Sequence, residues 1–527
     1  MPLPDSTDRV PGSRRSRLTA GLRHGVVAAA LCCCGPLAVQ AQSGAGVSTP
    51  APAGRVGGGQ LPTLGDSSAL AAAAERRLGD RIAREIYRDP DYLDDPVLLD
   101  YVDRIWQPLL AAAKARGEMS PEIEQRFAWE IMLGRDRTIN AFALPGGYFG
   151  VHLGLIGVVS NRDELASVLA HEMSHVTQRH ISRLISKQSE QTPWLIGAMI
   201  LGVLAAGKNP DAANAVLTGG QAVAMQNQLN FSREMEREAD RVGFGVMTQG
   251  GFAPQGFVSM FDKLQQASRL NDNGSFPYLR SHPLTTERIA DVQARQPPGP
   301  VVLLETTLEH AMVSARARVL SNSGADALRQ TVAEASGPVL AAAPPARQAG
   351  ALYGAVLALE KTRDFAAARM LLARLDGVTR STPQAQRLTH LLGAELALAS
   401  GQPAPTLAML GRPELLLSAQ ILTGQGRAAE VSQSLLSWLA IHPRDASAWQ
   451  LLSTASAAQG QTLRAIRADA EARVAELDYA GALERFKAAQ IMVRSASGSG
   501  VDHIEASIID TRARAVQLLF REQALER

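Results

Sequence analysis

The segment LAHEMSHVTQRH, residues 169–180, contains two histidines separated by one helical turn, His171 and His175. On an α-helix, positions i and i+4 lie on one face, so both imidazoles can bind a single zinc ion. Glu172 lies beside them and is expected to accept a proton from the attacking water rather than to bind the metal. The H-E-x-x-H pattern therefore predicts a zinc-dependent hydrolytic site, against the competing interpretation of a solvated helix with two unrelated histidines.

The sequence just before this motif favours a helix with a defined start. Asn161 suits an N-cap, and Glu164 follows three positions later, as in a capping box. Leu165, Val168 and Leu169 recur at helical spacing, which predicts one buried face. The motif is thus expected on a helix that is anchored in a core.

An acidic segment downstream supplies candidates for the third protein ligand that a catalytic zinc site needs. Ser232–Asp240 reads SREMEREAD, in which Glu236 and Asp240 lie one helical turn apart and Glu234 and Glu238 share the same spacing. One carboxylate would bind zinc, and another would hold the imidazole of a ligand histidine. Spacing alone does not choose between the two pairs.

Together these motifs resemble the HtpX-like and CAAX prenyl protease family of zinc metallopeptidases. The likeness rests on Leu169–His180, on Ser232 and Arg233, and on the sequence EREAD at Glu236–Asp240. It covers about residues 75–295, while the rest of the chain is similar only in architecture.

The resemblance implies a gluzincin-type site with one Zn²⁺ per chain. Its ligands would be His171, His175 and Glu236. Asp240 would not bind the metal but would contact one of the ligand side chains and support it. Glu238 would then matter little for zinc binding. Glu172 would be the catalytic base.

Two histidines near the motifs receive different predictions. His180 lies five residues beyond His175, away from the zinc-facing side of an ideal helix, and is predicted to be structural. His282 belongs to the segment Ser281–Ile289, which resembles one that recurs after the third ligand in the family. It is expected either to occupy the open zinc position as an inhibitory ligand or to donate to the oxyanion, for which Arg288 is also a candidate, or else to be a surface histidine.

Two segments beside the motifs have open interpretations. Asn140–Gly147, read with the β-prone runs around it, predicts a hairpin or meander that either pairs with an extended substrate or only packs in the core. Trp194–Gly207 is apolar but too short to span a bilayer as a helix. A buried helix, a lid over the cleft and a membrane-surface contact are all compatible with it.

The N-terminal part has the pattern of a secretory signal peptide. Basic residues precede the apolar stretch Val26–Val39, and Ala41 offers a small residue for cleavage. We expect residues 1–41 to be a signal peptide, with an uncleaved anchor or a core helix as the alternatives, and 42–74 to be a flexible linker. All three cysteines, Cys32 to Cys34, would leave with the peptide, and the protein would be periplasmic.

Composition and repeats complete the expected organisation. Hydrophobic residues make up 46% of the 527 residues, aromatic residues 5%, and the net charge of +2 argues against a nucleic-acid-binding protein. We expect a mainly α chain, with a metalloprotease domain of helices and a small β-sheet at 75–298 and an α-helical domain at 301–527. The second domain shows offsets of tetratricopeptide (TPR) repeats, for example at Tyr479, Ala482 and Phe486, although an ordinary helical bundle is the alternative.

These predictions combine into one functional hypothesis and one rival. The hypothesis is a periplasmic zinc endopeptidase that cleaves polypeptides. Misfolded or stalled outer-membrane proteins and their assembly machinery would be its partners through the TPR-like domain, as the resemblance implies. The rival is a periplasmic chaperone or scaffold whose zinc site is structural or idle.

Overall fold

The computed structural model describes residues 71–187, 232–269, 276–298, 304–495 and 502–525. The chain divides into two units, Met1–Thr63 and Leu64–Arg527, and every described residue belongs to the second. The predicted signal peptide and Trp194–Gly207 lie outside the described residues. The helical start at Ala72 falls just inside the range expected for the linker.

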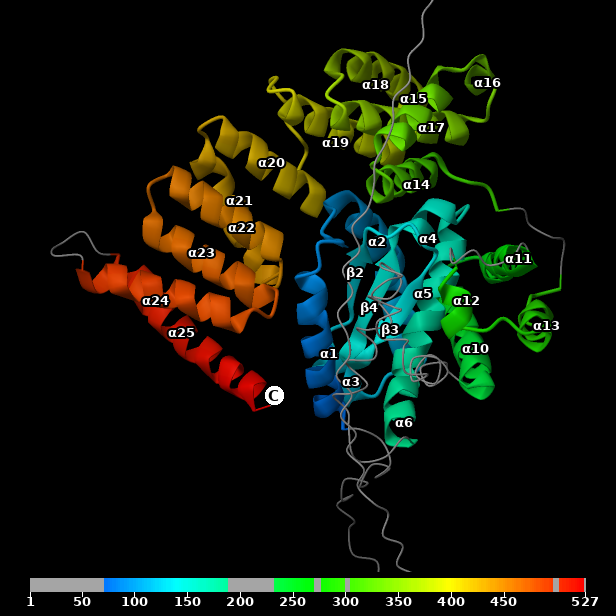
Figure 1. The fold of residues 1–527 in the computed structure, drawn as a ribbon, viewed down its shortest axis with the longest axis horizontal. Coiled ribbons are helices and arrows are strands. Elements are labelled where there is room, and N and C mark those ends of the chain that lie inside the picture. The colour runs from blue at the N-terminus through cyan, green and yellow to red at the C-terminus, as the bar shows by residue number, and fades with distance from the viewer. Residues whose placement is uncertain (1–70, 188–231, 270–275, 299–303, 496–501, 526–527) are drawn as a thin grey trace, which may run out of the picture. The chain divides into compact units, whose positions relative to one another are not determined.

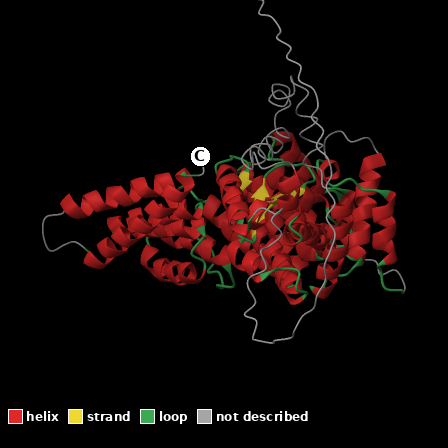
Figure 2. Ribbon diagram, turned by 90° about the horizontal axis from the view of Figure 1, so that it is seen from below, coloured by secondary structure: helices red, strands yellow, loops and turns green. Residues whose placement is uncertain are grey.

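Helices dominate the described part of the chain, and a small sheet lies among them (Figures 1 and 2). The elements up to residue 294 are α1 (Ala72–Tyr87), β1 (Tyr92–Leu93), α2 (Pro96–Ala115), α3 (Pro121–Arg126), β2 (Glu130–Gly134), β3 (Ala141–Leu144), the 3₁₀ turn η1 (Pro145–Gly147), β4 (Tyr148–His152), α4 (Leu153–Val158), α5 (Arg162–Thr177), α6 (His180–Lys187), α10 (Arg233–Gln249), α11 (Gln255–Arg269), α12 (Tyr278–Ser281) and α13 (Thr286–Ala294). This arrangement confirms the predicted fold class.

The later elements are all helical. They are α14 (Leu308–Ser321), α15 (Ala325–Ser336), α16 (Pro338–Ala341), α17 (Pro345–Lys361), α18 (Phe365–Thr379), α19 (Pro383–Ala399), α20 (Arg412–Gly424), α21 (Ala428–Ile441), α22 (Ala446–Ala458), α23 (Thr462–Ala475), α24 (Tyr479–Ser495) and α25 (His503–Ala524). From α17 to α25 each helix packs on its neighbour in sequence. The repeat positions Ala482, Phe486 and Ala489 are fully buried. The assignment of these helices to TPR repeats remains a prediction.

The sheet has four strands in the order β1-β2-β4-β3. β3 and β4 are antiparallel and are joined by η1, which confirms the hairpin predicted from Pro-Gly-Gly. Gly146 makes this turn possible, because its φ is 72° and a Cβ there would lie 2.8 Å from the Cα of Arg76. β2 pairs with β4 in parallel, so the alternative of a meander is wrong, and β3 is left at the edge of the sheet.

Helix α5 begins where the sequence predicts. The side chain of Asn161 accepts hydrogen bonds from the backbone N–H groups of Asp163 and Glu164, at 3.0 and 2.9 Å. Oε2 of Glu164 in turn accepts from the N–H of Ser160 at 2.7 Å. Every residue from Glu164 to Thr177 is buried, because α5 packs on α2, α10, α11 and β3. The motif thus lies on a central helix whose position is defined on several sides.

The other end of α5 is a sharp break. Arg179 has a φ of 56°, in the left-handed region that an L-residue rarely adopts, and α6 begins with the next residue, His180. The guanidinium of Arg179 contacts the buried carboxylate of Glu75, with Nε donating to Oε2 at 3.0 Å. This contact to α1 holds the turn in place.

Three arginines link the C-terminal helices to the first turns of α2. Each one contacts an acid at or before α2 and a second acid on or beside the later helices: Arg316 contacts Asp95 and Glu395, Arg387 contacts Asp100 and Glu414, and Arg412 contacts Asp94 and Asp445. Arg316 is the most buried of the three, with a side chain 6% exposed.

Among the described helices, none is both long and apolar enough to cross a bilayer.

Candidate metal centre

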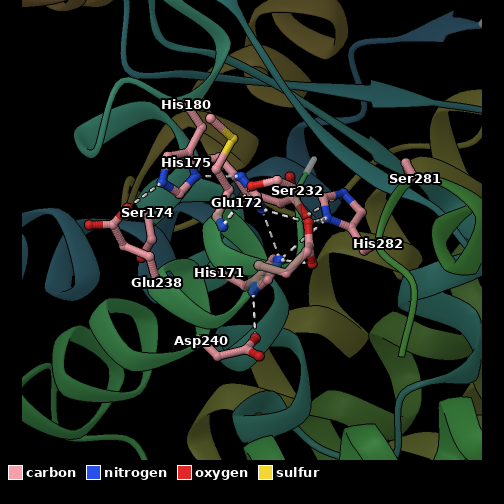
Figure 3. A network of polar contacts seen from close by, with 12 residues as sticks. His171, Glu172, Ser174, His175, His180, Ser232, Glu238, Asp240, Ser281 and His282 are labelled. Carbon is pink, nitrogen blue, oxygen red and sulfur yellow. Dashed lines mark hydrogen bonds and ion pairs between the residues drawn. The ribbon is translucent and has the colours of Figure 1, made fainter. Parts of the chain in front are cut away.

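Helices α5 and α10 run side by side and bring the predicted ligands together (Figures 1 and 3). The Nε2 atoms of His171 and His175 lie 3.0 Å apart. Oε2 of Glu236 lies 3.5 Å from Nε2 of His171, and its Oε1 lies 3.5 Å from Nε2 of His175. The helices approach closely because Gly243 has no side chain: a Cβ there would lie 3.0 Å from the carbonyl oxygen of Ala170.

His282 completes this group from the loop after α12. Its Nδ1 lies 3.0 Å from Oε1 of Glu236 and 3.3 Å from Nε2 of His171, and its ring stacks on Tyr278. His171, His175, Glu236 and His282 each offer one ligand atom, and these four atoms lie within 4.8 Å of one another. The interpretation of His282 as a surface histidine is wrong, since the residue is 2% exposed.

The donor set fits a zinc ion. Imidazole nitrogens and a carboxylate oxygen are typical zinc ligands. Burial lowers the pKa of His175 well below its ordinary value, so this ring is neutral and keeps a lone pair for a metal. Burial would also lower the pKa of His171, but contacts with Asp240 and Glu236 raise it to about 9. The group of side chains therefore attracts positive charge.

Glu172 points toward the same group of atoms. The residue is 1% exposed, and neither of its carboxylate oxygens has a hydrogen-bond partner among the described residues. Its Oε1 lies 3.4 Å from Nε2 of His282. Burial raises the pKa of Glu172 against the opposing charges of His282 and His171. Burying a carboxylate without hydrogen bonds costs free energy. This fits a site that binds further groups, such as water or substrate.

The outer face of His171 rests on a carboxylate. Its Nδ1 lies 2.9 Å from Oδ1 of Asp240. Arg288 donates to both carboxylate oxygens of Asp240, from Nε at 2.7 Å and from Nη2 at 2.8 Å. Its Nη1 also lies 2.7 Å from Oε2 of Glu236, as an ion pair that is not aligned as a hydrogen bond. These contacts commit Arg288 to the two carboxylates and argue against the predicted role as oxyanion donor.

The outer face of His175 meets a second imidazole. Its Nδ1 lies 2.9 Å from Nδ1 of His180, and Nε2 of His180 lies 3.1 Å from Oε2 of Glu238. Burial lowers the pKa of His180 to about 4, so this ring is neutral. The prediction that His180 points away from the site is wrong, because it assumed one continuous helix. The break at Arg179 turns His180 back toward His175, and spacing in the sequence gives no signal of that break.

Comparison with known proteins agrees with this geometry. Residues 101–296 match the model of peptidase family M48. The beta-barrel assembly-enhancing protease of Yersinia pestis is 30% identical over 426 residues, which are 78% of this chain and 83% of the relative. The protein of the same name from Escherichia coli is 30% identical over 319 residues, which are 60% of this chain and 62% of the relative. The mitochondrial metalloendopeptidase OMA1 of Saccharomyces cerevisiae is 28% identical over 196 residues, which are 36% of this chain and 54% of the relative.

The extent of these matches differs between relatives. The alignment spans just under two thirds of the Escherichia coli relative, and likewise 63% of a Vibrio cholerae relative that is 33% identical. The Yersinia pestis alignment covers 78% of this chain and includes part of the C-terminal helices.

Proposed function

Because this chain belongs to peptidase family M48, we propose that it is a zinc-dependent endopeptidase in which His171, His175 and Glu236 hold the metal. The observation that carries the proposal is the meeting of three buried ligand groups from α5 and α10 beside the buried carboxylate of Glu172, whose Oε1 lies 3.4 Å from Nε2 of His282. Bound zinc would supply Lewis acidity, which polarises a carbonyl and makes water a nucleophile near neutral pH.

Glu172 is the residue proposed to move the proton. Its carboxylate accepts a proton from the attacking water and then passes it to the amine that leaves the cleaved peptide bond. The support for this role is that its Oε1 lies 3.4 Å from Nε2 of His282, beside the ligand group. Asp240 contacts His171, and Arg288 contacts Glu236, on the sides away from the ligand atoms. These two side chains are therefore already ordered before substrate binds.

The edge strand β3 is the proposed binding site for the substrate backbone. Among the described strands β3 pairs with β4, and its other edge carries no strand. An extended polypeptide can add to such an edge through main-chain hydrogen bonds, which suits a peptidase that accepts many sequences. Helix α5, which carries the motif, packs on this strand.

His282 is proposed as a fourth donor that holds the site closed. Its Nδ1 lies within the group of ligand atoms, at hydrogen-bonding distance from Oε1 of Glu236. An imidazole in that place would compete with water for a bound metal, since neutral imidazole is a good zinc ligand. Activity then requires His282 to move away. In the alternative role, as a donor to the oxyanion, the imidazole of His282 would have to face the carbonyl oxygen of the substrate instead of the ligand atoms.

The cellular role is a wider proposal. The names of the Yersinia pestis and Escherichia coli relatives connect those proteins with β-barrel assembly, and we infer that this chain acts on polypeptides in outer-membrane protein quality control. The signal-peptide pattern supports a periplasmic location. The C-terminal helices would hold partners or substrates, and a membrane contact through Trp194–Gly207 stays a prediction.

The test compares the wild-type protein with Glu172→Gln. We expect about one zinc per chain in both proteins, because the substitution removes no ligand. Wild type should cleave casein or an unfolded β-barrel protein, and the variant should lose at least ~10²-fold in rate, because the proton acceptor is gone. Metal content by mass spectrometry and peptide products by gel are the readouts. A variant that cleaves at the wild-type rate would refute the mechanism, and a wild type that binds zinc and unfolded protein without cleavage would favour the chaperone or scaffold.

A further inference from the structure

His180 and Glu238 form a chain of contacts behind His175 that neither motif explains. Figure 3 shows His180 next to His175 on one side of the ligand group, while His282 lies on the opposite side. The two Nδ1 atoms of His175 and His180 are 2.9 Å apart, and His180 reaches Oε2 of Glu238 at 3.1 Å. Arg183 of α6 donates to the same oxygen at 3.1 Å. His180 is fully buried, so these contacts are not those of a surface side chain.

The chain of contacts has one consistent pattern of protons. If His175 binds a metal through Nε2, which faces Glu236, its proton is on Nδ1. His180 must then accept that proton at its own Nδ1, so its remaining proton is on Nε2. Nε2 of His180 is the atom that lies against Glu238, and a carboxylate is an acceptor. Every donor in the series meets an acceptor.

We propose that His180 and Glu238 are positioning residues that fix the tautomer and ring orientation of the zinc ligand His175. The inference rests on the proposed zinc site. Asp240 supports His171 directly, whereas Glu238 supports His175 through an intervening ring. The two ligands of α5 are therefore held by two carboxylates of α10, one by direct contact and the other through the ring of His180.

The break after α5 gives independent support for this role. A left-handed backbone at a residue other than glycine is strained and persists only where the surroundings hold it. Arg179 adopts that conformation and is held by Glu75 of α1, which is itself fully buried. Without the break, residue 180 would lie about 140° around the helix from residue 175 and could not face its Nδ1. The strained residue and the contact with His175 are thus parts of one arrangement.

The experiment measures zinc affinity by competition with a chromophoric chelator and the visible spectrum of the Co²⁺-substituted protein. His180→Ala should weaken zinc binding roughly 10–100-fold, the usual effect of losing such a partner, and should change the Co²⁺ bands because His175 reorients. His180→Asn keeps an acceptor near the position of Nδ1, so it should recover part of the affinity. Glu238→Gln keeps an oxygen but loses the charge. Its loss of zinc affinity should therefore be smaller than that of either His180 variant, but measurable against the wild type.

Two matched controls separate positioning from folding. His310→Ala removes another buried histidine, bonded to Tyr101 and Val159, that lies outside the ligand group. Glu234→Gln changes an exposed acid on α10. We expect His310→Ala to lower the thermal midpoint measured in chelator while leaving zinc affinity and the Co²⁺ spectrum unchanged, and Glu234→Gln to change neither.

Each outcome decides one of the two proposals. Wild-type affinity and spectrum in His180→Ala would overturn the positioning role, and so would an affinity loss that His310→Ala reproduces. If zinc binding in the wild type depends on His171, His175 and Glu236 while His180→Ala is normal, only this inference fails. If the wild type binds no zinc, the proposed function fails and this inference falls with it.

Discussion

Removal of the Asp240 carboxylate should change zinc affinity and folding stability by amounts that can be measured separately. The residue is 2% exposed and contacts His171 on one side and Arg288 on the other. Asp240→Ala removes both contacts, while Asp240→Asn keeps the shape. Asn cannot keep every contact, because its amide nitrogen must face a donor: either Nε of Arg288, or the oxygen position shared by His171 and Nη2 of Arg288.

The expected magnitudes follow from these contacts. Loss of the group that orients a ligand histidine typically costs 10–100-fold in metal affinity, or about 1.4–2.7 kcal/mol. Asp240→Ala also leaves the buried guanidinium of Arg288 without its two short hydrogen bonds, and breaking a buried pair in this way costs roughly 3–5 kcal/mol of stability. Since Glu236 still contacts Arg288, we expect the lower end of that range. Asp240→Asn should lose less zinc affinity than Asp240→Ala if its oxygen stays on His171.

The assay is zinc competition against a chelator, with the thermal midpoint of the chelator-treated protein measured in parallel. Glu234→Ala, on the exposed side of the same helix, is the control and should change neither quantity. If Asp240→Ala binds zinc as tightly as the wild type, the argument that the 2.9 Å contact orients His171 is refuted, however much the protein is destabilised.

Three other predictions test different parts of the molecule. His282→Ala should raise basal proteolysis if the side chain is a competing ligand, and a fall of up to ~10²–10³-fold in a peptide-cleavage assay would instead assign it to the oxyanion. Arg316→Leu removes the guanidinium from buried Asp95 and half-buried Glu395 and should cost roughly 3–5 kcal/mol in a denaturant titration, whereas Arg329→Leu at an exposed site should cost under ~0.5 kcal/mol. Burial, together with the charge of Glu395, raises the pKa of Glu360 from 4.5 to about 7, so folding stability should fall as pH rises through this interval. Glu360→Gln should therefore gain midpoint temperature over wild type as pH rises from about 5 to about 8, and a difference that is constant with pH would contradict the assignment.

The sequence predicted the parts of the site that depend on local periodicity. The start of α5 at Asn161 and the turn at Pro145–Gly147 follow from capping and turn chemistry, which act within a few residues. The meeting of His171, His175 and Glu236 followed from the family resemblance, because spacing did not choose between Glu236 and the other acids.

The parts that it missed depend on tertiary contacts. Strand β1 has two residues and exists because it pairs with β2, which no local pattern records. Arg288 looked like a free donor in sequence but lies between Asp240 and Glu236 in the fold. His180 was misplaced because the backbone of Arg179 depends on Glu75, which lies 104 residues earlier in the chain.

The geometry of α10 explains why one support is direct and the other needs an intermediate ring. Glu236 and Asp240 are separated by one helical turn, so both face α5 and reach its side chains directly. Glu238 lies between them in sequence, about 200° around the helix from Glu236 at 100° per residue, and its carboxylate is half-exposed beside α6. That carboxylate contacts His180 and Arg183 of α6. An imidazole can connect this carboxylate with His175, because its nitrogens lie on opposite edges of the ring and one can accept while the other donates. The break at Arg179 brings His180 into this position, so the end of α5 is as much a part of the metal centre as the motif itself.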